Sequence, residues 1–396
     1  MTDTLTFRVG NATAASVTIQ QEPEADDRGF MSRRLGPWWH RMNGRTSSKT
    51  RRWRLALTVA TTLCIPTVAQ SADFTIAVFP SPLGAVLKKA VIEPFRQASK
   101  LDVVADNREF GVGAVRAKIQ GGGNVWDIVT LENVEALQGC DEGYFIKIDK
   151  SKLPDLADFD LMDARFECGI PFIFYSTVLG YNKKKLKEEP TSWADFWDTK
   201  KWPGKRAIYK TPQDALEIAL LADGVPRGDV YKVLATTAGV DRAFKKLDQL
   251  KPNIVWWTNP GQSRQMLASG EVTMSTTYDN GIRYFNKTQG TDFGLVRKDA
   301  VTHVNYYAII AGSKHIDTAY AYLNFASKPQ AQAAVTNGLA ISVPNRKALP
   351  LVDKDLQPYL TTNPENLKDA LQSDAKFWLN NFDALATRFN AWVATP

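Results

Sequence analysis

Residues 253–285 constrain the fold more than any other part of the chain. A short β-prone run at 254–257 is followed by Asn259 and Pro260, a pair typical of a helix N-cap and the first helical position. The helix is expected to end at Gly270. A second β-prone run and a second helical start come next. This order of strand, helix, strand and helix predicts an α/β fold with parallel strands.

The carboxyl ends of these two strands should meet at one edge of the sheet, where folds of this kind bind ligands. That edge would bring Trp257 close to Tyr278 and Asp279, which end the second strand. Aromatic faces beside a carboxylate suit a ligand that carries an ammonium group. Trp256 and Trp257 also fit a packing role, because adjacent strand residues point to opposite faces. At most one of the two is therefore expected to touch the ligand.

Strands and helices alternate along the rest of the chain as well, which again argues for an α/β sheet. Short strands are predicted at residues 74–79, 101–105, 126–129 and 207–209, with helices at 83–98 and 112–119. Two β-rich runs, 170–181 and 305–311, suit segments that cross between two lobes. Residues 366–393 are strongly helical, and their aromatic face indicates packing in the core or between lobes.

Asp214 has two interpretations. It follows Thr211, Pro212 and Gln213, a run typical of a helix start with a cap and proline at the first position. Its carboxylate would then complement the helix dipole. Alternatively, it faces a cleft as a ligand carboxylate. The residues alone favour the capping role.

The first 72 residues are predicted to be an N-terminal extension and a signal peptide. A basic cluster precedes the apolar run 55–68, which is too short to span a membrane comfortably. Small residues allow cleavage after Ala69 or after Ser71, and Met42 is an alternative start. No later segment is apolar enough to be transmembrane. The mature protein is therefore expected to be soluble and periplasmic.

Net charge argues against nucleic-acid binding. The chain has 396 residues, a formal charge of +7 and 44% hydrophobic residues, enough for a large core in two domains. Residues 1–72 hold ten Lys or Arg and five Asp or Glu, which is +5 of the total, so the rest carries +2. A nearly neutral mature chain lacks the basic stripe that nucleic acid requires.

Two cysteines remain after the signal, Cys140 and Cys168. In an oxidising compartment such a pair indicates a disulfide, and the alternative is two unrelated buried thiols. No metal site is predicted, because only His303 and His315 remain and neither has ligand spacing with the cysteines. A glycine run at 121–123 lacks the Lys-Ser/Thr of a phosphate loop, and no cofactor motif or catalytic motif is present.

Several stretches carry a family resemblance, and they cover roughly residues 74–392. These stretches are GCDEG around Cys140, CGIPFIFYSTVLGYN, TSWADFWDTKKWPGKRAIY, LEIALLADGV, VDRAFKKLDQLKPNIVWW and GQSRQMLASGEVTMS. They resemble the periplasmic substrate-binding proteins of ABC transporters, of the spermidine/putrescine-binding type. The resemblance implies a type II periplasmic-binding-protein fold, with a ligand cleft between two lobes joined by two crossing segments.

The implied lobes divide the chain at the crossing segments. Lobe 1 would begin with residues 73–176, lobe 2 would comprise 177–305, and residues 306–396 would return to lobe 1 and form the C-terminal helices. The resemblance further implies a monomer without catalytic activity. Its partner would be an ABC permease in the inner membrane.

The resemblance also suggests ligand contacts. The aromatic-acidic cluster that polyamine binders carry after the first strand falls on Phe79 and Ser81, without an acid. Tyr278 matches an aromatic contact and Asp214 an acidic one, whereas the ammonium-binding Asp of the family falls on the neutral Asn305. The predicted ligand-binding set is Phe79, Ser81, Asp214, Trp256, Trp257, Tyr278, Asp279 and Asn305.

A small, polyamine-like amine is the predicted ligand. Losing two carboxylates should weaken a diamine clamp, because each buried ammonium group needs a charge partner. The alternatives are therefore a mono-cation, a polyamine in an altered pose, or an amino acid-like or other small solute such as 4-aminobutyrate. A ferric-ion carrier is a further rival, suggested by Tyr306 and Tyr307 near His303. Neighbouring strand residues face opposite ways, so both tyrosines cannot easily reach one ion.

Overall fold

The computed structural model describes residues 74–122, 126–159 and 166–395. The predicted export signal, with Ala69 and Ser71, lies outside these ranges. Among the described residues, no helix combines the length and the apolar character needed to cross a bilayer.

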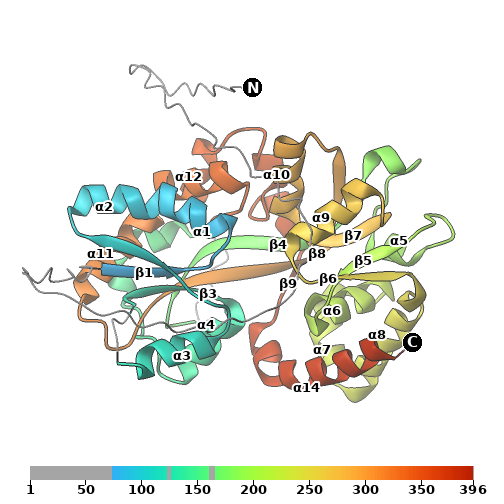
Figure 1. Ribbon diagram of the computed structural model, residues 1–396, viewed down its shortest axis with the longest axis horizontal. Coiled ribbons are helices and arrows are strands. Elements are labelled where there is room, and N and C mark those ends of the chain that lie inside the picture. Colours follow the sequence, from blue (N-terminus) through green and yellow to red (C-terminus); the bar gives the residue numbers. More distant parts are fainter. Residues whose placement is uncertain (1–73, 123–125, 160–165, 396) are drawn as a thin grey trace, which may run out of the picture. The chain divides into compact units, whose positions relative to one another are not determined.

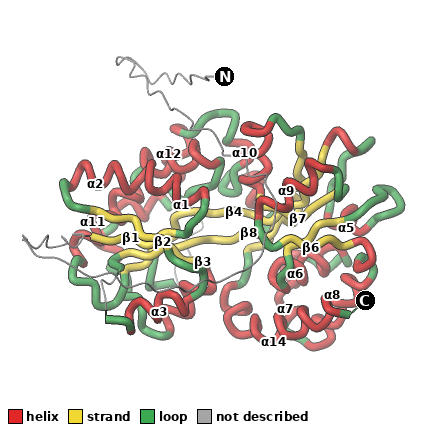
Figure 2. Tube along the Cα trace, viewed as in Figure 1, coloured by secondary structure: helices red, strands yellow, loops and turns green. Residues whose placement is uncertain are grey.

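The described strands form one mixed sheet in the order β2-β1-β3-β8-β4-β7-β5-β6, with β9 paired to β8 (Figures 1 and 2). The strands are β1 (Phe74–Val78), β2 (Val103–Asn107), β3 (Ile128–Glu132), β4 (Ile170–Asn182), β5 (Arg206–Tyr209), β6 (Ile254–Trp257), β7 (Met274–Tyr278), β8 (Phe293–Ile309) and β9 (Leu371–Gln372). The predicted α/β class is confirmed.

Helices cover both faces of this sheet (Figure 1). They are α1 (Pro82–Leu87), α2 (Glu93–Ser99), α3 (Val112–Gln120), α4 (Asn133–Asp141), α5 (Trp193–Trp197), α6 (Pro212–Ala222), α7 (Val230–Leu234), α8 (Thr237–Asp248), α9 (Pro260–Ser269), α10 (Asp279–Gln289), α11 (Ile316–Ser327), α12 (Pro329–Leu339), α13 (Pro364–Lys368) and α14 (Ala375–Ala394). A π-helical turn, Lys88–Ile92, joins α1 to α2, so the predicted helix at 83–98 is continuous but not uniform.

The predicted unit at 253–285 is present as β6, α9, β7 and α10. Asn259 caps α9 by accepting the Gly261 N–H at 2.8 Å, and Pro260 occupies the first helical position. Gly270 ends the helix with φ of 79°, in the left-handed region that glycine adopts without strain. The two strands are not neighbours, because β5 lies between β6 and β7 and pairs with both in parallel.

Two antiparallel strands connect the parallel halves of the sheet. β2, β1 and β3 are parallel to one another, as are β6, β5 and β7. β4 and β8 run side by side between these halves, antiparallel to each other, with β8 also antiparallel to β3 and β4 to β7. They are the crossing segments that the sequence predicts at 170–181 and 305–311.

β8 begins at Phe293, well before the predicted start at 305. The charged run Arg297, Lys298 and Asp299 hides this part of the strand from a hydrophobicity pattern. These residues also interrupt the pairing with β4. Thr177 of β4 pairs with Val301, but Leu179, two residues later, pairs with Val296, so β8 has extra residues between the two pairs. Such an extra loop is a β-bulge, which lets polar residues leave the ladder without ending the strand.

Each half of the sheet has its own apolar core. One cluster joins β1, β3 and the end of β8 to α1, α2, α11 and α12, and another joins β5 and β7 to α6, α8 and α14. The aromatic face of α14, with Trp378 and Phe389, is buried in the second of these clusters. Core packing is therefore the role of the C-terminal aromatics, while the exact lobe boundaries remain a prediction.

A disulfide joins Cys140 at the end of α4 to Cys168 just before β4, with their Cα atoms 5.7 Å apart. The predicted pairing is confirmed. The bond fixes the helix that follows β3 to the entrance of a crossing strand.

Candidate ligand-binding site

The carboxyl ends of β3 and β7 converge on the crossing strands. Glu132, the last residue of β3, pairs with Asn305 of β8, and Asn305 pairs in turn with Ile173 of β4. Tyr278, the last residue of β7, pairs with Thr177 of β4. Ile173 and Thr177 are four residues apart, so the two strand ends are about 13 Å from each other along β4. Irregularities of the β4–β8 register lie on both sides of this segment, a feature common next to functional sites.

Aromatic rings fill the space between these strand ends. Tyr175 and His303 are cross-strand partners, and their rings stack with centroids 5.0 Å apart. Tyr278 meets Tyr175 edge-on at 5.0 Å and Trp257 edge-on at 6.0 Å. Tyr209, which ends β5, stacks on Trp257 at 4.3 Å. We call Tyr175, Tyr209, Trp257, Tyr278 and His303 the ring cluster.

Asp214 is buried against the ring cluster. Its carboxylate accepts a hydrogen bond from Thr177 Oγ1 at 2.6 Å and contacts His303 Nε2 at 2.9 Å. Its backbone has φ of 69° and ψ of −45°, which a non-glycine residue adopts at a cost of about 1–3 kcal/mol. Such strain is typical of functional positions, where the surrounding structure imposes it.

The carboxylate of Asp214 lies at the start of α6 but bonds to Thr177 and His303, so the dipole interpretation does not account for its contacts. Gln213 and Asp214 are both non-helical and form a kink at the start of α6, so Asp214 does not lie in a regular first turn. The sequence pattern of Thr211 and Pro212 is typical of a helix start, but the kink turns the carboxylate toward β4 and β8. The alternative interpretation, a carboxylate held at the ligand edge, fits these contacts.

Burial gives this region unusual protonation behaviour. Burial by itself would lower the pKa of His303, but the charge and hydrogen bond of Asp214, with the charges of Glu132 and Glu217, raise it above 6.5. Burial, reinforced by the charge of Glu135, raises the pKa of Glu132 to about 7. Burial and the charge of Asp214 raise the pKa of Glu217 above its ordinary value.

Asp279 lies on the other side of β4. Its carboxylate accepts the Ser176 N–H at 3.2 Å and the Thr361 hydroxyl at 2.7 Å, and it pairs with Arg297 at 3.1 Å. The Ser176 hydroxyl lies 3.0 Å from that of Thr361, whereas the side chain of the next residue, Thr177, bonds to Asp214. Because successive strand residues face opposite sides, the two aspartates act on opposite faces of β4.

The two tryptophans of β6 also separate. Trp257 is fully buried in the ring cluster, and its Nε1–H donates to Thr276 Oγ1 at 3.2 Å. Trp256 packs edge-on against Phe389 and Trp392 of α14, at 5.5 and 6.0 Å. This arrangement agrees with the expectation that adjacent strand residues have different environments.

The remaining predicted ligand residues are Phe79 and Ser81, which follow β1, and Asn305 on β8. Phe79 is buried, stacks on the exposed Phe110 at 4.6 Å and has the Arg108 guanidinium over its ring at 4.6 Å. Ser81 caps α1 by accepting the Gly84 N–H at 3.4 Å. Asn305 is buried next to Glu132, and its Oδ1 has no hydrogen-bond partner among the described residues.

Four further members of the site are not among the predicted residues: Glu132, Tyr175, Tyr209 and His303. Glu132 and Tyr209 end strands whose positions the sequence indicates, so the strand-end rule applied throughout would have found them. Tyr175 and His303 lie inside the crossing strands. No local motif marks them, because their proximity depends on the β4–β8 register.

The side chains of the tyrosines that suggested a ferric-ion carrier lie apart from each other. Tyr306 packs on Phe166 and Tyr307 on Phe172, in different apolar clusters, so the two hydroxyls do not converge. Within residues 74–122, 126–159 and 166–395, no group of three or more His, Cys, Asp or Glu is placed to hold a metal ion.

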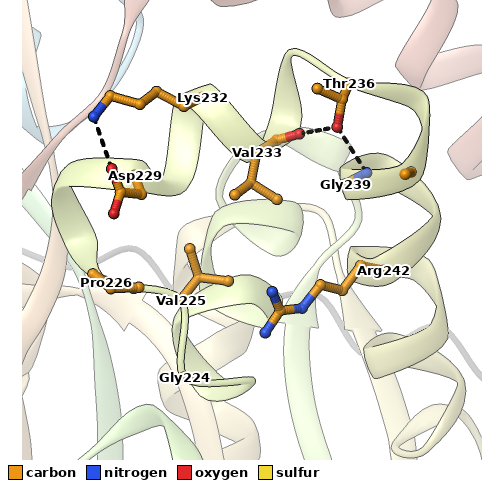
Figure 3. A pocket seen from close by; sticks show the side chains of 10 residues that line it. Gly224, Val225, Pro226, Asp229, Lys232, Val233, Thr236, Gly239 and Arg242 are labelled. Atoms are coloured by element: carbon orange, nitrogen blue, oxygen red, sulfur yellow. Dashed lines mark hydrogen bonds and ion pairs between the residues drawn. The ribbon is translucent and has the colours of Figure 1, made fainter.

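A surface depression of about 580 Å³ lies at the corner of α6, α7 and α8 (Figure 3). Its polar groups already have partners: Lys232 pairs with Asp229 at 2.8 Å, Thr236 accepts the Gly239 N–H at 3.0 Å to cap α8, and Arg242 donates to Asp223 at 2.7 Å. It shares no residue with the ring cluster. The strand-end region is therefore the better candidate for a ligand.

Similarity to known proteins identifies the family of this chain. Residues 90–368 match the family of bacterial extracellular solute-binding proteins. The gamma-aminobutyric acid-binding protein of Pseudomonas aeruginosa is 39% identical over 326 residues, which are 82% of this chain and 92% of that protein. The putrescine/cadaverine-binding protein of the same organism is 25% identical over 282 residues, 64% of this chain and 76% of that protein.

The solved structure of the Atu4243–GABA receptor matches with a TM-score of 0.73 at 28% identity, over 82% of this chain and 98% of the other. The chain thus belongs to the bacterial extracellular solute-binding family and has the type II periplasmic-binding-protein fold. It is a substrate-binding protein that serves an ABC transporter, and not an enzyme.

Proposed function

We propose that this protein captures an ω-amino acid of the 4-aminobutyrate type in the periplasm and delivers it, as a monomer, to an ABC permease of the inner membrane. Export through a cleaved N-terminal signal is part of this proposal. The observation that carries the ligand class is the position of Asp214, a buried carboxylate held against aromatic rings at the strand ends.

The ammonium group would bind at Asp214. A carboxylate offers about four acceptor sites, and Thr177 and His303 use two of them, so acceptor capacity remains for a ligand. Tyr175 and Tyr278, both half-buried, present faces or edges beside it. A desolvated cation–π contact contributes about 2 kcal/mol, and a buried charge partner contributes more.

The carboxylate group of such a ligand requires a cation at the same edge. The exposed Lys210 follows Tyr209 directly, and its backbone N–H donates to the Trp257 carbonyl at 2.9 Å, which fixes the backbone of Lys210 beside the ring cluster. Arg264 of α9 is the other candidate. Burial lowers the pKa of Arg264, and its guanidinium is close enough to Tyr278 to interact with it electrostatically. Its Nε lacks a hydrogen-bond partner among the described residues.

Similarity to known proteins supports the same class. The relative with 39% identity is a gamma-aminobutyric acid-binding protein, and one matching structure is a GABA receptor. The relative named for putrescine and cadaverine is only 25% identical.

A diamine is the second candidate ligand. Glu132 supports it, because it ends β3, is half-buried and interacts electrostatically with Asp214 across the crossing strands. A diamine would need both groups ionised, since each buried ammonium requires a charge partner. The raised pKa of Glu132, about 7, works against this at neutral pH.

Isothermal titration calorimetry with mature protein, stripped of bound ligand, separates these possibilities. 4-Aminobutyrate should bind more tightly than putrescine at pH 7. 4-Aminobutanamide, which keeps the ammonium group and loses the carboxylate, should bind at least tenfold more weakly than 4-aminobutyrate. Lys210→Met and Arg264→Met then identify the cation, because the correct substitution removes the preference for the acid over the amide.

Succinate and glucose serve as controls. Binding of succinate or glucose without binding of either amine would contradict the proposed ligand class. Equal affinities for 4-aminobutyrate and its amide would contradict the carboxylate contact.

Closure of the two predicted lobes can be measured separately. If residues 177–305 move against the rest about β4 and β8, small-angle X-ray scattering should show a smaller radius of gyration with saturating ligand. An unchanged radius would contradict a closing cleft.

A further inference from the structure

We propose that His303 is a specificity-determining residue of this site. Its imidazole, bonded to Asp214 inside the ring cluster, sets how much positive charge the site accepts, so that discrimination between one ammonium group and a diamine changes with pH. The inference rests on the proposed function, in which an amine binds at Asp214.

The geometry makes His303 the internal competitor of the ligand. It is 6% exposed, and its Nε2 lies 2.9 Å from Asp214, the position that a ligand ammonium group would share. Its ring is held by stacking on Tyr175 at 5.0 Å. When it is protonated, the imidazole of His303 is therefore a cation of the protein itself that lies beside Asp214.

Charged and titratable groups face His303 from each neighbouring element. They are Asp214 and Glu217 of α6, Glu132 of β3, Tyr175 of β4 and, through Tyr175, Tyr278 of β7. Two arginines near this region are paired with other carboxylates, whereas Arg264 and Lys210 lie near Tyr278 and Tyr209 at the edge proposed for the ligand carboxylate. Arg108 pairs with Glu135, and Arg297 pairs with Asp279 on the opposite face of β4.

Counting charges gives the direction of the effect. When His303 is protonated and Glu132 is neutral, these two groups and Asp214 together have no net charge, so neither ammonium group of a diamine would have an unpaired counter-charge. When His303 is neutral and Glu132 ionised, the same three groups carry two negative charges. The second state fits a diamine.

Both changes occur in the same direction as the pH rises. The pKa of His303 lies above 6.5 because of Asp214, and that of Glu132 is about 7. A bound cation favours the deprotonated forms, so amine binding releases protons and affinity rises by up to about tenfold per pH unit for each proton released. The rise is larger for a dication than for 4-aminobutyrate, whose carboxylate brings a compensating negative charge.

The test measures the affinities of putrescine and 4-aminobutyrate from pH 6.0 to 8.5. Alkylammonium groups have a pKa of about 10.4, so both ligands keep their charges over this pH range. We expect the ratio of putrescine to 4-aminobutyrate affinity to rise at least tenfold for the wild-type protein. Calorimetry in buffers of different ionisation enthalpy should show more proton release for putrescine.

Substitution of His303 assigns the effect. His303→Gln keeps a neutral hydrogen-bond donor for Asp214, so it should raise the putrescine ratio at pH 6.0 and lose part of its pH dependence. His303→Asn serves as a second variant. His315→Gln is the matched control, because His315 also contacts an aspartate, Asp127 at 3.0 Å, but lies outside the ring cluster.

The outcomes distinguish the two proposals. A wild-type ratio that does not change with pH overturns the role of His303 while leaving the proposed function in place. A His303→Gln protein with the wild-type pH dependence overturns it as well. If neither amine binds at any pH, the proposed function and this inference both fail.

Discussion

The two faces of β4 carry one buried aspartate each, and the two are held in different ways. Asp279 accepts from a backbone N–H and a hydroxyl and pairs with Arg297, a cation at every physiological pH. Asp214 accepts from a hydroxyl and contacts His303, whose charge depends on pH. The charge of Asp214 also acts on Glu132, on Glu217 and on Tyr278 of the ring cluster.

This difference indicates which carboxylate can serve a ligand. The charge of Asp279 is already balanced inside the protein, and its contacts join β4 to α10 and to the C-terminal segment at Thr361. The charge of Asp214 is balanced only when His303 is protonated. A ligand cation can therefore replace the partner of Asp214 but would have to compete with a permanent ion pair at Asp279.

Asp279→Asn should give the largest effect, and the effect should be on stability. Asp279 is buried and Arg297 is partly buried, so removing the carboxylate leaves Arg297 without its counter-charge, which costs up to about 3–5 kcal/mol of unfolding free energy. Chemical denaturation of ligand-free protein measures this. The exposed Asp353→Asn should change it by less than about 0.5 kcal/mol.

The same variant also tests the sequence-based prediction that Asp279 contacts the ligand. If Asp279→Asn keeps wild-type stability but loses amine affinity, then Asp279 is a ligand carboxylate and the contrast between the two faces is wrong.

Asp214→Asn should act chiefly on affinity. Loss of the buried charge partner of an ammonium group costs about 2–5 kcal/mol of binding free energy, which is roughly 30- to 5,000-fold in Kd. Calorimetry with 4-aminobutyrate measures it, with Asp353→Asn as the control. Unchanged affinity would place the ammonium group elsewhere, with Glu132 as the next carboxylate to substitute.

Tyr278→Leu should weaken amine binding by about 2 kcal/mol, the value of a desolvated cation–π contact. Leucine keeps apolar bulk beside Trp257 and Tyr175, so the change isolates the ring face. Tyr284→Leu is the matched control, since Tyr284 lies on α10 and is 40% exposed. Equal losses in the two variants would show a general effect on α10 rather than a ligand contact.

The sequence predicts local structure better than the site. The unit at 253–285, the crossing strand at 170–181 and the disulfide follow from patterns of a few residues, and the structure contains each of them. The start of β8 is missed because the charged residues around Lys298 leave the strand as a bulge.

The site itself depends on long-range register. Tyr175 and His303 meet because β4 and β8 pair over most of their length, and neither residue lies at a predicted strand end. Asp214 shows the opposite difficulty. Its neighbours form a convincing helix start, and only the kink at the start of α6 turns its carboxylate toward β4. Local propensity cannot reveal a strained backbone that tertiary contacts impose.

The last prediction concerns how stability depends on pH without ligand. The folded pKa values of Glu132 and Glu217 are raised above their ordinary 4.5 by burial. Between pH 4.5 and these values the folded protein binds more protons than the unfolded chain, so stability falls as pH rises. His303 acts in the same direction, because its contribution is fully present below 6.5 and is lost above its raised folded pKa. Each group contributes a slope of at most about 1.4 kcal/mol per pH unit.

Glu217→Gln tests the largest part of this slope. Glu217 is fully buried, and its Oε1 accepts from Trp378 Nε1 at 2.6 Å and from the Tyr231 hydroxyl at 2.9 Å. Glutamine keeps an acceptor oxygen for these donors but cannot ionise. As the pH rises from 5 to 7, the unfolding free energy of ligand-free Glu217→Gln should therefore fall by about 1 kcal/mol less per pH unit than that of wild type, whatever its absolute stability. The exposed Glu365→Gln should keep the wild-type slope. If Glu217→Gln also keeps the wild-type slope, the protonation of Glu217 does not change on folding. The face of β4 that carries Asp214 would then depend less on pH than we infer from its contrast with the Asp279 face.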